Sequence, residues 1–182
     1  VLHAVELPHL GEGLLSAPRL SIAACGTGPG WRGAALAVSL DDGLRWEAVG
    51  STALPAIIGE IEVPPGSADP AIEDLRNALV VTLMHEGMQL NDAYTALIGD
   101  ELIQFGNATP LGANRWRLTR LWRGRRGSEA SIGLAVAGGR FVLIEPDTLL
   151  QRDVPMASSG EVRVMAVAVN DETGVEAHAL RT

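Results

Sequence analysis

The sequence has no lysine, one cysteine and one tyrosine among its 182 residues, and its net charge is -8. The acidic balance disfavours nucleic-acid binding, because that affinity comes from neutralising phosphates with basic side chains. No apolar run approaches the roughly 20 residues that a transmembrane helix needs. Cys25 cannot form a disulfide within the chain, and we expect it to be a buried structural thiol.

Hydrophobic residues make up 47% of the chain, which excludes a disordered polypeptide and allows one substantial core. The chain begins with Val1, lacks a signal-peptide pattern, and has closely spaced Pro8, Gly11 and Gly13. We therefore expect residues 1–17 to be a linker in a fragment of a longer polypeptide. The segment PPGSADP, residues 64–70, is the best internal boundary, so the β-rich module 18–182 has a two-lobe alternative, 18–66 and 71–182.

Most of the chain alternates between apolar and polar residues, which is typical of strands. Strands are predicted over 19–25, 34–40, 53–63, 79–84, 101–105, 115–122, 140–145, 162–169 and 175–180. A helical turn is expected at 91–96 and a short helix at 128–136, with a strand that turns at Gly138 and Gly139 as the alternative for the second segment. The prediction is an all-β fold, either a β-sandwich or a partly closed β-barrel, with about nine strands and one or two short helices.

The clearest local prediction is a hairpin formed by 101–105 and 115–122. Trp116, Leu118 and Trp122 lie on one face of the second strand, and we expect that face to point inward. Arg120 interrupts this apolar face, which indicates a bulge or a strand end near it. The loop between the strands contains residues that suit turns, namely Pro110, Gly112 and Asn114.

A second turn follows the spacing S-x-D-x-G-x-x-W at Ser39, Asp41, Gly43 and Trp46, which resembles the Asp-box hairpin of sialidase-like propellers. The carboxylate and the hydroxyl can accept hydrogen bonds from turn amides, and the glycine can adopt a positive φ. The spacing occurs once, whereas a propeller requires several repeats. We interpret it as a structural turn, with sugar contact by Trp46 as the alternative.

Patterns that would indicate catalysis or a cofactor are incomplete. His85 and Glu86 open an H-E-x-x-H motif whose second histidine is missing. The GTGPG loop at 26–30 lacks the lysine of a phosphate-binding loop, and no G-x-S-x-G elbow is present. Carboxylates that could pair for glycoside hydrolysis are expected on solvated strand faces; these are Glu60, Glu62, Asp100 and Glu101. We predict no catalytic residues, metal or cofactor.

The segment WRGRRG places Arg123, Arg125 and Arg126 around two glycines. Their guanidinium groups can bind carboxylates with two parallel hydrogen bonds. Two interpretations remain open: pairing with acids of the same chain, or contact with a neighbouring subunit or ligand. Trp31 and Trp46 are the further candidates for contact, as aromatic surfaces that sugars could cover.

Two segments, ALIGDELIQF and RWRLTRLWRGRRGSE, resemble the C-terminal region of tail-tip and baseplate hub proteins of the gene transfer agent type, related to phage tail proteins. The likeness continues more weakly through VELPHL, AVSLDDGLRW and GGRFVLIE. Ser128 stands where that family's pattern has threonine, which keeps the hydroxyl group.

The resemblance implies a virion structural protein of a phage-like particle or prophage, made in the bacterial cytoplasm and located in the tail. Expected partners are other tail or baseplate proteins, further copies of the chain in the full-length assembly, and a bacterial surface glycan if the module attaches to the host. A carbohydrate-binding module is the first alternative, and a glycoside hydrolase is the second.

Overall fold

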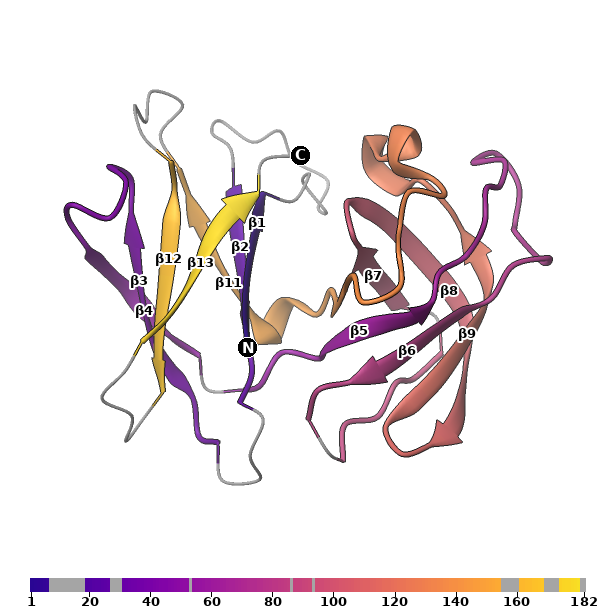
Figure 1. Cartoon of the computed structure of the whole chain (residues 1–182), viewed down its shortest axis with the longest axis horizontal. Helices are drawn as coiled ribbons and strands as arrows, with labels where there is room; N and C mark the ends of the chain where they lie inside the picture. The colour runs from indigo at the N-terminus through magenta and orange to yellow at the C-terminus, as the bar shows by residue number, and fades with distance from the viewer. Residues whose placement is uncertain are drawn as a thin grey trace. The chain divides into compact units, whose positions relative to one another are not determined.

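The computed structural model describes residues 1–6, 19–26, 31–52, 54–85, 87–92, 94–154, 161–168 and 174–180. These residues form thirteen strands and three 3-10 turns, with no α-helix among them (Figure 1). The all-β prediction is therefore confirmed. The two expected helices are wrong, because 94–98 is a strand and 128–136 contains only a single 3-10 turn. No described helical segment is long and apolar enough to cross a membrane.

The chain divides into two compact units, so each is described by itself. Unit 1 comprises Val1–Ala56 and Pro146–Thr182, and unit 2 comprises Ile57–Glu145. Unit 2 is thus an insertion in the sequence of unit 1. The proline-rich segment 64–70 lies inside unit 2. The two units therefore do not divide at this segment.

Unit 2 is a closed barrel of six antiparallel strands in the order β10-β5-β6-β9-β8-β7 (Figure 1). The strands are β5 Ile58–Val63, β6 Leu79–Leu83, β7 Tyr94–Ile98, β8 Glu101–Gly112, β9 Arg115–Trp122 and β10 Arg140–Leu143. Alternating apolar residues fill the interior, and the cluster of buried side chains is Ile61, Leu79, Val81, Leu83, Leu90, Ala96, Ile98, Ile103, Phe105, Leu118, Leu121, Phe141 and Leu143.

The β8–β9 hairpin turns at two residues, Ala113 and Asn114, which both have positive φ (50° and 59°). This geometry matches the twist of the flanking strands. Pro110 lies within β8, opposite Trp116, and not in the loop as expected. Because β7 pairs with β8 only as far as Phe105, one side of β8 is free of ladder bonds at Pro110.

The β9 strand changes its inward face at Arg120, where φ is 58°. Leu118 and Leu121 are both fully buried, although they are three residues apart, whereas Trp122 is 38% exposed. A left-handed residue between them turns the second leucine inward. The predicted bulge or strand end near Arg120 is wrong, because β9 runs to Trp122 and its register with β8 does not shift at Arg120. The irregularity there is a left-handed residue within the strand. The predicted inward position of Trp122 is also wrong.

Unit 1 is a seven-stranded sheet in the order β11-β2-β1-β13-β12-β3-β4. Its strands are β1 Leu2–Glu6, β2 Arg19–Ala24, β3 Ala34–Ser39, β4 Glu47–Thr52, β11 Leu149–Asp153, β12 Arg163–Ala168 and β13 Val175–Leu180. The start of the expected linker is a strand, because β1 pairs with β2 and, in parallel, with β13. The rest of that segment, 7–17, lies outside the described residues.

One apolar cluster packs the sheet of unit 1, and its buried members are Leu2, Ala4, Leu20, Ile22, Ala24, Ala34, Leu36, Val38, Val154, Val162, Val164 and Ala166. Cys25 follows β2 and is buried, as expected, and burial raises the pKa of its thiol. Residues before and after the inserted unit 2 contribute strands to this sheet and side chains to its core.

Candidate functional site

The arginine-rich segment forms a tight turn after β9. Gly124 has φ 58°, Arg126 has φ 59° and Gly127 has φ 91°, and the 3-10 turns η1 Arg125–Gly127 and η2 Glu129–Ser131 follow one another. A Cβ atom on Gly124 would lie 2.8 Å from the Glu129 Cα atom. The turn therefore requires glycine at this position for both its backbone angle and its space.

Arg123 is completely buried and binds Glu101, which is also completely buried. Its Nε atom donates to Glu101 Oε1 at 2.7 Å, and its Nη2 atom donates to Oε2 at 2.8 Å. The Gly124 amide donates to the same Oε1 at 3.1 Å. Arg123 thus faces the interior and is not placed to contact a ligand or subunit at the surface. Glu101, expected on a solvated face, is its partner.

Asp74 completes this buried charge cluster. The Arg123 Nη1 atom donates to Asp74 Oδ2 at 3.3 Å and to the carbonyl oxygen of Gly66 at 2.8 Å. The amides of Arg76 and Asn77 each donate to Asp74 Oδ1 at 3.0 Å. Burial raises the pKa of Asp74, but the hydrogen bonds from Asn77, Arg76 and Arg123 outweigh it and lower the pKa overall.

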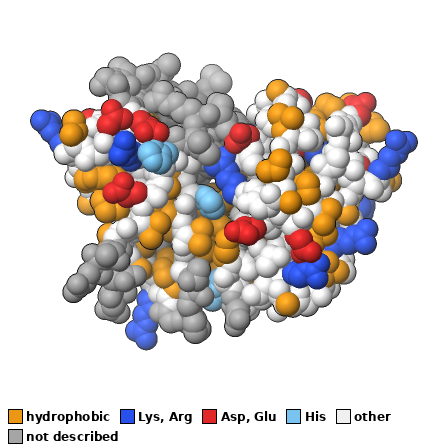
Figure 2. Space-filling model, viewed as in Figure 1, with side chains coloured by type: hydrophobic (Ala, Val, Ile, Leu, Met, Phe, Trp, Pro, Cys, Tyr) orange, Lys and Arg blue, Asp and Glu red, His pale blue; other side chains and the backbone are white. Residues whose placement is uncertain are grey.

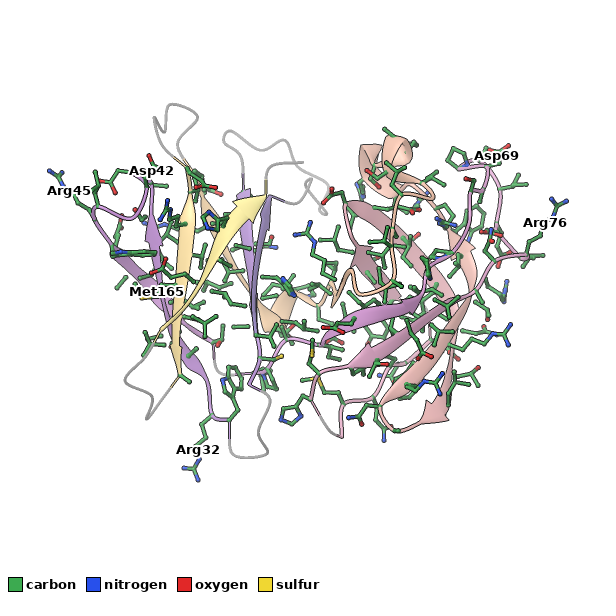
Figure 3. All side chains as sticks on the ribbon, viewed as in Figure 1. Arg32, Asp42, Arg45, Asp69, Arg76 and Met165 are labelled. Atoms are coloured by element: carbon green, nitrogen blue, oxygen red, sulfur yellow. The ribbon has the colours of Figure 1, made fainter. Side chains whose placement is uncertain are left out.

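The loop from 64 to 78 folds back over the barrel to bring Asp74 into place. Asp74 pairs with Leu121 of β9 through two backbone hydrogen bonds, 2.7 and 3.1 Å long. The Asn77 side chain accepts from the Gly66 amide and donates to the Ser67 carbonyl. Figure 3 shows Asp69 and Arg76 of this loop at the edge of the barrel, with Arg76 pointing away from it.

Ser128 fastens the other side of the turn. Its Oγ atom accepts a hydrogen bond from the Leu102 amide at 2.9 Å and donates to the Arg125 carbonyl oxygen at 2.8 Å. A hydroxyl group at this position therefore joins the turn to the start of β8, next to Glu101. Serine and threonine both supply that group.

Arg125 and Arg126 are exposed on the turn that Arg123 anchors. Other arginines of the barrel form ion pairs at its surface: Arg115 with Glu62, Arg120 with Glu73, and Arg140 with Asp100. On the face seen in Figure 2, basic and acidic side chains of this unit lie beside one another. Arg115 lowers the pKa of Glu62 by hydrogen bonding. One arginine of the segment pairs internally and two are exposed, so contact of Arg125 and Arg126 with a neighbouring subunit or ligand stays a prediction.

Sequence reasoning missed the role of Asp74 and the burial of Glu101. Arginine and glutamate are rarely buried unless they are paired, so residue type alone favoured the surface for both members. The sequence did hold one signal for this pair. Glu101 lies at the start of β8 and Arg123 directly follows β9, and these two strands were predicted to pair. Asp74 offered no such signal, because it follows a loop without periodicity.

The Asp-box spacing in unit 1 forms the predicted turn between β3 and β4. Ser39 Oγ donates to Asp41 Oδ1 at 2.9 Å and accepts from the Gly43 amide at 2.9 Å. The Arg45 amide donates to Asp41 Oδ1, and this bond and the Ser39 hydroxyl lower the pKa of Asp41. Gly43 has φ 89°. Figure 3 shows Asp42 and Arg45 at the tip of this hairpin.

The two tryptophan candidates are both partly buried. Trp31 packs against the core of unit 1, and its ring lies so close to Gly26 that no side chain could fit there. The Trp46 ring lies 3.8 Å from the position of a Cβ on Gly43, so it folds over the turn as expected. Both rings belong to unit 1, whereas the arginine turn belongs to unit 2.

The metal and nucleotide patterns receive no support from the described residues. Glu86 and residues 27–30 lie outside them. Among the residues that are described, no group of three histidine, cysteine or acidic side chains could hold a metal ion.

Residues 56–142 match the family model described as Rcc01698-like, C-terminal, and Rcc01698 is a gene transfer agent protein. The match covers nearly all of the barrel unit, including the buried charge cluster and the arginine turn. No curated protein matches the chain at a significant level.

Proposed function

We propose that this chain is a structural, non-catalytic part of the tail tip or baseplate hub of a phage-like particle of the gene transfer agent type. Its role would be to contribute to assembly of the tip and to contact with the host surface. The chain would be made in the bacterial cytoplasm and located in the tail. Its partners would be other tail or baseplate proteins and further copies of itself.

The observation that carries the proposal is the turn at the end of the barrel. Two exposed arginines, Arg125 and Arg126, stand on a turn that Arg123 and Ser128 fasten to the barrel from both sides. Such a turn fixes the backbone from which the two guanidinium groups extend, which lowers the backbone entropy lost on binding a partner. Carboxylates of a neighbouring subunit are the partner that paired guanidinium forks fit best.

The absence of catalysis is part of the proposal and follows from where the acids lie. A glycosidase needs one acid held neutral beside a second that is ionised. Glu101 instead binds Arg123 with both oxygens, and Asp74 has a lowered pKa. Glu62 and Asp100 are each bound to an arginine. We expect no hydrolysis of peptidoglycan or bacterial polysaccharide by the chain.

The test uses the full-length polypeptide in a bacterium that produces the particles. Substitution of Arg125 and Arg126 by alanine should lower the yield of complete particles at least tenfold, while the purified chain keeps its melting temperature. The matched control is Arg117→Ala, which removes another exposed arginine, on β9 of the same barrel. Electron microscopy and sedimentation measure the yield. An unchanged yield of complete, infective particles would contradict the assembly role of the turn.

A carbohydrate-binding module is the second candidate, favoured by the partial exposure of both Trp31 and Trp46. Exposed indole rings commonly provide flat apolar surfaces for recognition. A glycan array probed with the chain, with Trp46→Ala as the paired variant, separates the candidates. Glycan binding that is lost in the variant supports the module, and an array without hits removes it.

A further inference from the structure

Three strands of unit 1 bring polar side chains together on one face of the sheet. Arg163 of β12 lies directly opposite Ser39 of β3 and His178 of β13. Residues directly opposite each other in antiparallel strands place their side chains on the same face. The two chain neighbours of Arg163, Val162 and Val164, are buried in the core of unit 1, so this shared face is the outer one. Arg163 and His178 therefore lie side by side on the outside of the sheet.

The Asp-box turn brings an indole ring to the same place. A Cβ atom on Gly43 would lie 3.5 Å from Arg163 Nη1, 3.6 Å from Arg163 Cδ and 3.8 Å from Trp46 Cζ2. The guanidinium group and the ring thus both border one glycine of the turn. The Arg163 side chain is 32% exposed and Trp46 is also partly exposed, so a ligand in solvent can reach both.

The Arg163 guanidinium group lacks an acceptor. Arg163 forms no hydrogen bond with the part of the chain that the structure describes, and its Nε atom is buried without a partner. The neighbouring Glu161 carboxylate pairs with His178, with Oε1 2.8 Å from Nδ1, and its Oε2 atom stays 3.7 Å from Arg163 Nη2. That distance is too long for a hydrogen bond. Buried donors in folded proteins are satisfied by the chain, by water or by a ligand, so an acceptor from outside the described chain belongs here.

We propose that this corner of unit 1, formed by Asp42, Trp46, Glu161, Arg163 and His178, binds a neutral sugar. We call it the Trp46–Arg163 corner. The apolar face of a sugar ring would pack on Trp46. Two neighbouring hydroxyl groups would bond at once to Arg163, which only donates, and to Glu161, which only accepts, because a hydroxyl group does both. Asp42 positions the glutamate, since its Oδ1 atom accepts from the Glu161 amide at 2.8 Å.

The charges around the corner favour a neutral sugar over an acidic one. Asp42 and Glu161 are exposed, and so is Glu176, which lies on the same face of β13 as His178. Figure 2 shows a histidine of this unit beside basic and acidic side chains. A carboxylate on the ligand would be attracted by Arg163 but repelled by the acids, whereas a neutral sugar avoids that repulsion. The inference names a site for the host-surface contact of the proposed function and rests on that contact for its biological role.

The test is an NMR titration of the full chain, isotopically labelled at nitrogen, with the methyl glycosides of glucose, galactose, mannose and N-acetylglucosamine. The Arg163 Nε–H and Trp46 indole N–H signals, assigned from Arg163→Lys and Trp46→Phe, should shift saturably with at least one of them. Arg163→Lys keeps the charge and removes the Nε donor, so it should weaken binding at least tenfold. Arg45→Lys is the matched control and should bind as the parent chain does, because Figure 3 shows Arg45 pointing outward from the tip of the same hairpin.

Absence of a saturable shift with all of these glycosides would overturn the proposal, and equal affinity in a folded Arg163→Lys chain would place the site elsewhere. If circular dichroism shows that Arg163→Lys does not fold, Trp46→Ala takes its place with the same expected loss. Tighter binding of methyl glucuronide than of every neutral glycoside would reject a neutral ligand. Failure of the titration rejects the corner alone, whereas an unchanged particle yield in the variant of Arg125 and Arg126 rejects the assembly role, so the two results are distinguishable.

Discussion

The two units complete their sheets by different means. In unit 2, β10 hydrogen-bonds to β5 on one side and to β7 on the other, so every strand of the barrel has two partners. In unit 1, the edges β4 and β11 meet through side chains without a backbone ladder. A closed ladder leaves no edge strand, whereas a contact through side chains leaves two. One chain thus combines a sheet closed by backbone hydrogen bonds with a sheet whose described edge strands meet through side chains.

The units also differ in where they place their anchoring charges. Unit 2 holds Arg123, Glu101 and Asp74 in its interior, whereas the β3–β4 turn of unit 1 is held by Asp41 at the surface. Removing one member of a buried ion pair is costly, because the remaining charge is left in the interior without a partner. A surface carboxylate that loses its partners is solvated instead. The predictions below test this difference.

The largest expected effect is that of Arg123→Met, which should lower the free energy of unfolding by about 3 to 5 kcal/mol. The reason is that the Glu101 carboxyl group would remain buried without its bidentate partner. Urea unfolding measures the change. Arg115→Met, at an exposed pair with Glu62, should leave the free energy of unfolding nearly unchanged.

The double variant Arg123→Met/Glu101→Met provides the sharper control. Removing both charges together should recover much of the lost stability, because no isolated charge remains in the interior. If Arg123→Met costs as little as Arg115→Met, the charge cluster does not anchor the barrel end, and the comparison between the units fails on this point.

The next effect tests the change of face in β9. Leu118→Ala should cost about 2 to 5 kcal/mol, because Leu118 is fully buried in the barrel core. Trp122→Ala removes a larger side chain but one that is 38% exposed, and it should cost less. Both are measured by urea unfolding at one pH. If Trp122→Ala lowers the free energy of unfolding more than Leu118→Ala does, Trp122 lies on the inward face after all, which contradicts the change of inward face at Arg120.

The fold was predictable where the signals are local. The hairpin around 101–122 and the Asp-box turn each follow from a few neighbouring residues whose backbone preferences or bonds decide the geometry. The closing of the sheets was not predictable in this way. β1 pairs with β13 from the opposite end of the sequence, and β11 is too polar after Leu150 to show an alternation.

The candidate site shows the same limit. The arginine segment was recognisable as a turn that binds carboxylates, but which arginine turns inward depends on the loop that brings Asp74 to Leu121. That loop is joined to β9 by pairing between residues distant in sequence. Burial of charge is a property of such tertiary pairing, and residue type predicts the opposite for arginine and glutamate.

The smallest expected effect concerns pH, and it separates a buried carboxylate, Asp74, from a partly exposed one, Asp41. Asp74 and Asp41 both have a lowered pKa in the folded chain. Each therefore contributes stability that is fully present above the pKa of an unfolded aspartate, near pH 4, and that is lost as the pH falls through the folded value. Asp74→Asn should lower the free energy of unfolding at pH 7. Between pH 7 and pH 3, that free energy should then fall less than it does in the parent chain.

Asp41→Asn should flatten that decline less, because solvent screens the hydrogen bonds of an exposed turn. Urea unfolding midpoints between pH 7 and pH 3 measure both slopes. Asp69→Asn, in the same loop as Asp74 but exposed, is the matched control and should keep the slope of the parent chain. If Asp41→Asn and Asp74→Asn flatten the decline equally, the interior position of Asp74 gives it no larger part in acid stability, and burial is not what distinguishes the anchors of the two units.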